Sequence, residues 1–178
     1  MHFFSQLFQY NYPWQHVTNG VWYKYPNPHC GHVASVDVVD RSVDPDTGIV
    51  RTERVIGVRQ SAPKWIITIL GGTPDAFVRE VSFVDPVSRH TSLTTVNLSM
   101  SQYLTVLEKI HYVPSPLDSG ATQFHQTAEI QARRGMWRTL AERLERWSAE
   151  RITQNADSGR KGFEFVLETF RTPSQLPA

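Results

Sequence analysis

Apolar and polar residues alternate in seven segments of the chain, and this alternation predicts β-strands. The N-terminal segment HFFSQLFQY alternates loosely with a period of two, which is typical of a strand with one buried face. Six further segments form three pairs, and each pair is joined by a stretch with the composition of a turn. The pairs are 32–40 with 49–58, 76–84 with 91–99, and 102–113 with 122–132. Short connections join antiparallel neighbours, so we expect a meander.

Apolar residues at helical spacing predict a short helix near the start of the chain and a long one at its end. Pro13 suits the first position of a helix, and apolar residues follow it at Trp14, Val17, Val21, Trp22 and Tyr25. The second stripe starts near Met136 and contains Trp137, Leu140, Leu144, Trp147, Phe163, Val166, Leu167 and Phe170. A helix of roughly 34 residues would be about 50 Å long. We therefore expect an α+β fold in which a curved antiparallel sheet wraps around a C-terminal helix and leaves a cavity.

The densest apolar run, WIITIL, lies where the neighbouring residues predict a connector. It covers 65–70, between Pro63 and the pair Gly71-Gly72. As a helix, six residues rise only about 9 Å, whereas the hydrocarbon core of a bilayer is about 30 Å thick. We expect a loop or a single helical turn with an apolar face, and not a membrane span.

Composition and charge narrow the class of protein. The 178 residues are 40% hydrophobic and 20% charged, which predicts one globular domain, here 1–172, with a disordered tail at 173–178. A formal charge of +1 argues against nucleic-acid binding, although residues 133–161 are locally basic. The single cysteine, Cys30, excludes an internal disulfide. We recognise no secretory signal and no mitochondrial presequence.

Candidate catalytic and metal-binding residues are few. His29, Cys30 and His32 resemble part of a metal site, but no second cluster supplies the remaining ligands, so we expect no metal. His32 opens a strand and could point inward. The glutamates on the expected strands should face water, and they are Glu53, Glu80, Glu108 and Glu129. No nucleophile and base can be paired, so we expect neither an enzyme nor a cofactor.

The apolar stripe of the long helix is interrupted by polar residues. After Trp147, the same face continues with Arg151 and Asn155, and then with Gly159 and Gly162. One interpretation is that the stripe rotates out of register and leaves Arg151 in water. The other is that Arg151 and Asn155 line a cavity and meet the anionic end of a ligand, because a buried Arg is costly without an anion.

Seven short motifs, taken in order, span most of the chain. They are YPW at 12–14, KYPNP at 24–28 with HV at 32–33, RTERVI at 51–56, PKWIITILGGT at 63–73, REVSFVDP at 79–86, NLS at 97–99 and RWSAERITQNA at 146–156. Together they resemble the PRELI-domain family of mitochondrial intermembrane-space lipid transfer proteins. NYPW with PKWIITILGGT is most similar to the Slowmo-type branch, associated with phosphatidylserine.

The resemblance implies a function and partners. The family fold is a seven-stranded sheet wrapped on a long C-terminal helix, in agreement with the pattern above. Members carry one phospholipid at a time between the outer and inner mitochondrial membranes, as heterodimers with a small twin-CX9C chaperone in the intermembrane space, and contact anionic membranes transiently. A phosphatidic acid carrier is the alternative within the family, and a lipid-binding or scaffold module without transfer is the alternative outside it.

The resemblance also implies a headgroup site. The positions that match family headgroup residues are Lys24, His32, Arg54, Arg151 and Asn155. Two of them, Arg151 and Asn155, are the residues that interrupt the helical stripe. Val58 and Ser158 stand where family members can carry lysines, so the details of the headgroup cage stay open.

The apolar run then has a possible role as a lid. Desorbing a two-tailed phospholipid exposes about thirty CH₂ groups at about 0.8 kcal/mol each, so a carrier needs an apolar cavity that opens at the membrane. A short apolar element could cover the chains in solution and enter the interface on docking. The expected lid and docking residues are Pro63, Lys64, Trp65, Ile66, Ile67, Ile69 and Leu70. The alternative is a helical turn packed permanently into the core.

Overall fold

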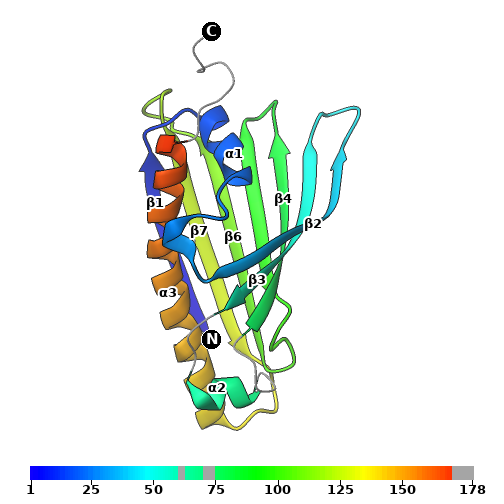
Figure 1. Ribbon diagram of the computed structural model, residues 1–178, viewed down its shortest axis with the longest axis vertical. Helices are drawn as coiled ribbons and strands as arrows, with labels where there is room; N and C mark the ends of the chain where they lie inside the picture. The colour runs from blue at the N-terminus through cyan, green and yellow to red at the C-terminus, as the bar shows by residue number, and fades with distance from the viewer. Residues whose placement is uncertain (60–62, 70–74, 170–178) are drawn as a thin grey trace.

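The computed structural model describes residues 1–59, 63–69 and 75–169. The strands are β1 (His2–Tyr10), β2 (Val33–Val43), β3 (Val50–Arg59), β4 (Asp75–Asp85), β5 (His90–Asn97), β6 (Leu104–Pro114) and β7 (Thr122–Ala132). The helices are α1 (Trp14–Trp22), α2 (Lys64–Ile69) and α3 (Arg138–Thr169), with a 3₁₀ turn, η1, at Pro28–Cys30. The expected α+β fold is confirmed, with seven antiparallel strands and a long C-terminal helix (Figure 1).

The strands form one sheet in the order β1-β7-β6-β5-β4-β3-β2, so all neighbours except β1 and β7 are consecutive in the chain. Two turns are closed by aspartates. Asp44 accepts the N–H groups of Asp46 and Thr47, and Asp85 accepts those of Val87 and Ser88. These side chains replace backbone acceptors in the turn and favour the hairpins that the sequence predicts. Register shifts between β2 and β3 add to the curvature of the edge.

Helix α3 runs along the β1–β7 side of the sheet for nearly the full length of the molecule (Figure 1). It begins at Arg138, two residues later than the apolar stripe suggests. Trp137 therefore lies outside the helix, and its side chain is 84% exposed, so its assignment to the buried stripe was wrong. Helix α1 also ends earlier than its stripe, at Trp22 rather than Tyr25. Phe170 and the predicted tail lie outside the described residues.

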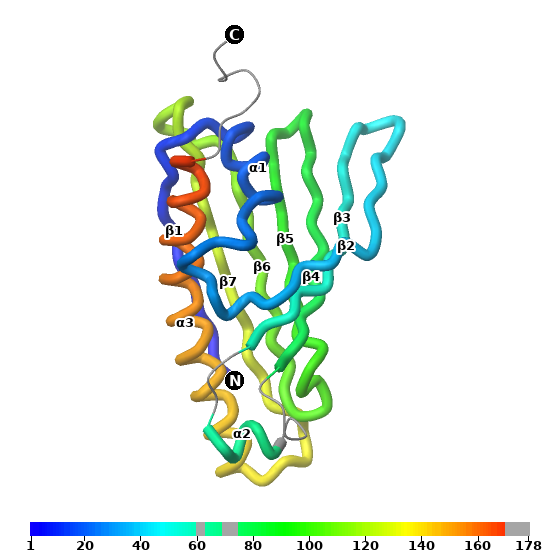
Figure 2. Tube along the Cα trace, in the orientation of Figure 1, coloured from blue at the N-terminus to red at the C-terminus, as the bar shows by residue number. Residues whose placement is uncertain are grey.

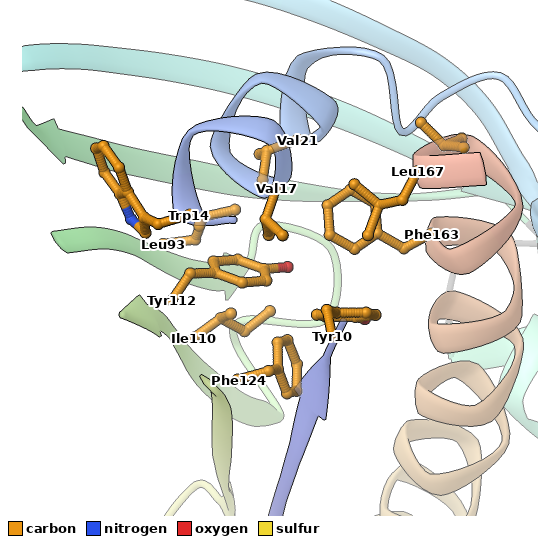
Figure 3. Packing of buried hydrophobic residues seen from close by; sticks show 11 residues of the cluster. Tyr10, Trp14, Val17, Val21, Leu93, Ile110, Tyr112, Phe124, Phe163 and Leu167 are labelled. Atoms are coloured by element: carbon orange, nitrogen blue, oxygen red, sulfur yellow. The ribbon is translucent and has the colours of Figure 1, made fainter. Parts of the chain in front are cut away.

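A hydrophobic cluster fills one end of the space between the sheet and α3 (Figure 3). It joins the first strand and α1 to the last two turns of α3. Aromatic rings meet edge to face: the Tyr10 ring lies 5.3 Å from Phe163 at 90°, and the Tyr112 ring lies 5.9 Å from Phe163 at 61°. This aromatic core fixes the C-terminal part of α3 against the sheet.

A second buried cluster lies at the opposite end, where α3 begins. It contains Ile66 of α2 together with Met100, Leu104, Ile130 and Leu144. Helix α2 crosses this end beside the start of α3 (Figure 2). No helix within the described ranges is long and apolar enough to cross a bilayer.

Candidate functional site

A cavity of about 280 Å³ lies between the two clusters and is lined by the concave face of the sheet and by α3. Its volume far exceeds that needed by one water molecule. The apolar part of the wall includes Phe8, Val21, Ile56, Leu93, Leu104, Val106, Ile110, Tyr112, Phe124 and Ile152. Four Lys or Arg side chains and two carboxyl groups also line it: Lys24, Arg54, Arg151, Arg160, Glu80 and Glu108. The cavity is thus an apolar space with a strongly charged wall.

Lys24 brings a positive charge to the wall from the segment after α1. Its Nζ lies 5.4 Å from the centre of the Tyr25 ring and 5.7 Å from that of Phe163, and the described residues give it no ion pair. Burial acts against its charge, but Coulombic interactions with Tyr25, Glu108 and Glu80 outweigh burial and raise the pKa of Lys24. Lys24 is therefore a positive charge on the cavity wall that makes no ion pair with the described residues.

Two glycines of α3 allow the Lys24 segment to approach. A Cβ on Gly162 would lie 2.5 Å from the side-chain oxygen of Asn27, and one on Gly159 would lie 3.9 Å from Lys24 Nζ. Asn27 in turn holds the segment, because its Oδ1 accepts the N–H groups of His29 and Cys30. The glycines that interrupt the apolar stripe thus admit the chain that carries Lys24.

Arg54 is committed to a buried ion pair. Its Nε and Nη2 both donate to Glu80 Oε1, at 2.9 and 2.5 Å, and both residues are almost fully buried. The Trp22 ring lies 5.7 Å from the Arg54 guanidinium and covers it. Because Glu80 neutralises it, Arg54 is a poorer anion site than Lys24. The expectation that Glu80 faces water was wrong.

Glu108 was also predicted to face water, and this prediction was wrong, because Glu108 lines the cavity. Gln126 donates to it, and Gln6 donates to Gln126. Burial raises the pKa of Glu108, with the Gln126 hydrogen bond and the Lys24 charge opposing that rise. Glu53 is half-buried in a network with Arg51 and Arg79, which lowers its pKa to about 2, and only Glu129 is exposed as expected.

The polar residues of α3 reach the cavity as well. Arg151 and Asn155 both line it, so the interpretation that the stripe rotates into water is not supported. The Arg151 guanidinium donates to Gln154 at 3.1 Å and lies 5.9 Å from the Trp147 ring. The indole Nε1 of Trp147 is buried and has no hydrogen-bond partner among the described residues. It is a free donor beside a cation.

His32 lies on the same wall, and burial together with the Lys24 charge lowers its pKa. The structure thus brings all five positions of the predicted headgroup site to one cavity. Sequence reasoning missed Glu80, Glu108 and Gln126, whose only signal was a polar residue at an inward position of a strand. The partial metal pattern at 29–32 gains no support, because the described ranges contain no group of three or more His, Cys, Asp or Glu that could hold a metal.

The apolar run forms a short helix with two different sides. Ile66 is fully buried, Trp65 is half-buried with the Arg143 guanidinium 4.9 Å from its ring, and Pro63, Lys64 and Thr68 are exposed. Within the described ranges α2 does not line the cavity, although it packs on Met100 and Leu104, which do. Leu70 and the Ile69 side chain lie outside what the structure describes.

A curved sheet that closes on a long helix and leaves a charged cavity defines a class of α+β proteins built around an internal space. Residues 15–173 match the PRELI-like family, and the chain belongs to it. The mitochondrial protein UPS2 of Saccharomyces cerevisiae is 42% identical over 171 residues, covering 96% of this chain and 74% of that protein.

Two further relatives also match most of the chain. A UPS-like protein of Schizosaccharomyces pombe is 40% identical and covers 94% of this chain and 90% of its own. A slowmo homolog of Dictyostelium discoideum is 29% identical and covers 89% of this chain and 68% of its own. The resemblance to the PRELI family is confirmed.

Solved structures share the fold at low identity. The Zhui aromatase/cyclase of a Streptomyces species superimposes with a TM-score of 0.64 at 9% identity, over 94% of this chain and 93% of its own. A START superfamily protein of Mycobacterium smegmatis gives a TM-score of 0.50 at 13% identity, over 94% of this chain and 98% of its own. Identity this low shows a common fold only.

Proposed function

We propose that this protein carries single phospholipids, with phosphatidylserine as the preferred cargo, between the outer and inner mitochondrial membranes. The observation that carries the proposal is the Lys24 ammonium, which makes no ion pair with the described residues and lies on the wall of a cavity that combines apolar with charged side chains. A phospholipid has the complementary chemistry, since it joins an anionic phosphate to apolar chains. Membership of the PRELI-like family and a relative designated mitochondrial support the carrier and its location.

The phosphate would meet Lys24, Arg151, Asn155 and the Trp147 indole. Lys24 and Arg151 are charged donors without a carboxylate partner among the described residues, and charge-assisted hydrogen bonds to phosphate are strong. His32, which lies near Lys24, would add a neutral donor or acceptor. Arg54 would hold the cavity wall in place through its ion pair with Glu80, and it would not bind the phosphate itself.

The proposed carrier acts without catalysis or cofactor, bound to a small twin-CX9C chaperone in the intermembrane space. Helix α2 would serve as its lid: the exposed Lys64 meets anionic headgroups, and the apolar side leaves the core when the protein docks. Trp65→Ala with Ile67→Ala should lower transfer and vesicle binding together. A loss of thermal stability alone would assign α2 to the permanent core.

The experiment is phospholipid transfer between liposomes, measured by mass spectrometry on a panel of headgroups with the chaperone-bound protein. Arg151→Glu should lower transfer by at least about tenfold, because it puts a negative charge where the phosphate binds. Lys161→Glu is the matched control, since Lys161 is exposed on the same helix and does not line the cavity.

The headgroup that moves tests the finer claim. Selective transfer of phosphatidylserine supports the proposal, and selective transfer of phosphatidic acid keeps the carrier but replaces the cargo. If folded protein docks on donor vesicles and moves no lipid, the protein is a binding or scaffold module.

A further inference from the structure

An exposed tryptophan lies among arginines in the turn between β7 and α3, which spans residues 133–137. The Trp137 side chain is 84% exposed, and Arg133, Arg134 and the first helical residue Arg138 are exposed around it. Residues 130–141 contain no Asp or Glu. Glu142 pairs with Arg138 at 2.9 Å, but both side chains are exposed, so the pair offsets little of the local charge.

The turn is held in place by the fold. The Arg133 N–H donates to the Tyr103 carbonyl at 2.8 Å, and Arg133 Nε donates to the Ser101 carbonyl at 3.0 Å. Met136 packs against the buried cluster around Leu144. The Trp137 carbonyl accepts the N–H groups of Leu140 and Ala141 in the first turn of α3. The indole therefore projects from a tethered turn, and its exposure is a feature of the native structure.

The turn is linked to α2 through the start of α3 and through a shared buried cluster. Arg143, one turn into α3, covers the Trp65 ring at 4.9 Å, and Ile66 and Met136 belong to the same buried cluster. Both elements lie at the same end of the molecule (Figure 1). Lys64 adds another exposed cation on α2. This end thus combines an exposed indole with several cations.

Such a combination matches the surface of an anionic bilayer. Indole rings are enriched at the membrane–water interface, where one edge is apolar and the other is wet, and nearby Arg or Lys side chains are attracted to anionic headgroups. A protein partner would need a contact surface of about 800 Å² on each side, whereas this turn offers one protruding ring within a few residues. We infer that the β7–α3 turn is a docking surface for anionic bilayers, with Trp137 as its anchor.

The inference rests on the proposed function in one respect, since a carrier must meet the membrane to load and unload. It adds a surface outside both the cavity and the apolar run. It also explains why α2 and the turn lie together: docking through the turn would hold α2 against the bilayer.

Trp137→Ser tests the anchor, and Leu117→Ser is the matched control. Leu117 is 94% exposed but lies in the β6–β7 connection, at the opposite end of those strands. Binding is measured by co-sedimentation with vesicles of phosphatidylcholine, with and without phosphatidylserine. Trp137→Ser should weaken binding to anionic vesicles by about tenfold, and Leu117→Ser should bind as the native chain does.

Arg134→Gln with Arg138→Gln tests the charge. Each removed cation should weaken binding to anionic vesicles by about fivefold, and the loss should shrink as salt rises. Arg89→Gln with Lys109→Gln removes the same charge from the β4–β5 turn and from β6, and should leave binding unchanged. Unfolding curves establish that all variants are folded.

Two results would overturn the inference. In the first, both turn variants bind anionic vesicles as well as the native chain does. In the second, the turn variants no longer bind a protein partner but still bind vesicles. Phospholipid content after purification separates this test from that of the carrier. The turn variants should retain as much bound phospholipid as the native protein. If the native protein never contains phospholipid, the proposed function fails while the docking result still stands.

Discussion

Helix α3 passes through two different environments against one sheet. Near its end, Phe163 and Leu167 are 1% exposed among aromatic rings of β1, β6 and β7. Two to three turns earlier, Arg151 and Asn155 face a cavity whose strands present Arg54, Glu80 and Glu108. The same sheet thus supplies apolar partners at one level and charged partners at the next.

The comparison shows how a small domain can hold a hollow without collapsing. The aromatic core and the cluster at Ile66 close the two ends, and both consist of well-packed apolar side chains. Charged groups between them resist collapse, because Arg54, Glu80 and Lys24 would lose their solvation or their partners in a closed apolar core. Stability therefore resides mainly in the ends, and binding chemistry lies in the middle.

The largest expected effect is on the aromatic core. Phe163→Ala should lower the free energy of unfolding by about 3–5 kcal/mol, because it empties a site enclosed by Tyr10 and Tyr112. Phe165→Ala, two residues along and 39% exposed, should cost less than about 1 kcal/mol. Urea unfolding measures both. Equal losses would mean that the core is not centred on Phe163.

The buried ion pair is the second test. Glu80→Ala should cost about 3 kcal/mol, because Arg54 is left charged and buried without its partner. Glu164→Ala removes the partner of Arg160 from an exposed i,i+4 pair and should cost no more than about 0.5 kcal/mol. If urea unfolding gave similar values for the two, water would have to reach Arg54 freely.

Substitutions at two glycines of α3 should change the stability of the fold in opposite directions. Gly162→Ala should destabilise the fold by about 1–3 kcal/mol, because its Cβ would lie 2.5 Å from the Asn27 side chain, which caps η1. Gly159→Ala meets no atom closer than 3.9 Å and should stabilise the helix by up to about 1 kcal/mol. Thermal unfolding distinguishes them. Stabilisation by both would show that the Asn27 segment moves aside easily.

The smallest effect expected is a pH dependence from the cavity. The pKa of Glu108 is raised by burial, so the folded state binds its proton more tightly than the unfolded state does. Stability from this group is full below the unfolded pKa of about 4.5 and falls as pH rises toward the folded pKa. Glu108→Gln keeps an acceptor for Gln126 and should be more stable than the native chain at neutral pH, with the difference vanishing below about pH 4.

Unfolding curves at several pH values check this prediction. A constant difference between the Glu108→Gln variant and the native chain would show that Glu108 does not titrate in this window. Phe165→Ala serves as a control, because no titrating group is changed.

The element order, the antiparallel meander and the family can all be predicted from the sequence. These depend on local information, namely alternation along strands, Asp and Gly in turns, and helical spacing at the end. The sequence also indicates that Arg151 and Asn155 are unusual, because two polar residues interrupt an apolar stripe. The motifs that resemble the PRELI family predict that Lys24, His32 and Arg54 belong to the same site.

Which strand residues face the cavity depends on the tertiary fold and cannot be predicted from local patterns. A strand residue points inward or outward according to the pairing register and to which face α3 covers, and neither is local. Thr52, Arg54, Glu80 and Ser82 are buried polar residues on the inner face, so an apolar pattern could not mark that face. For the same reason Trp137 belonged to the stripe by spacing, yet the turn before α3 places it in solvent.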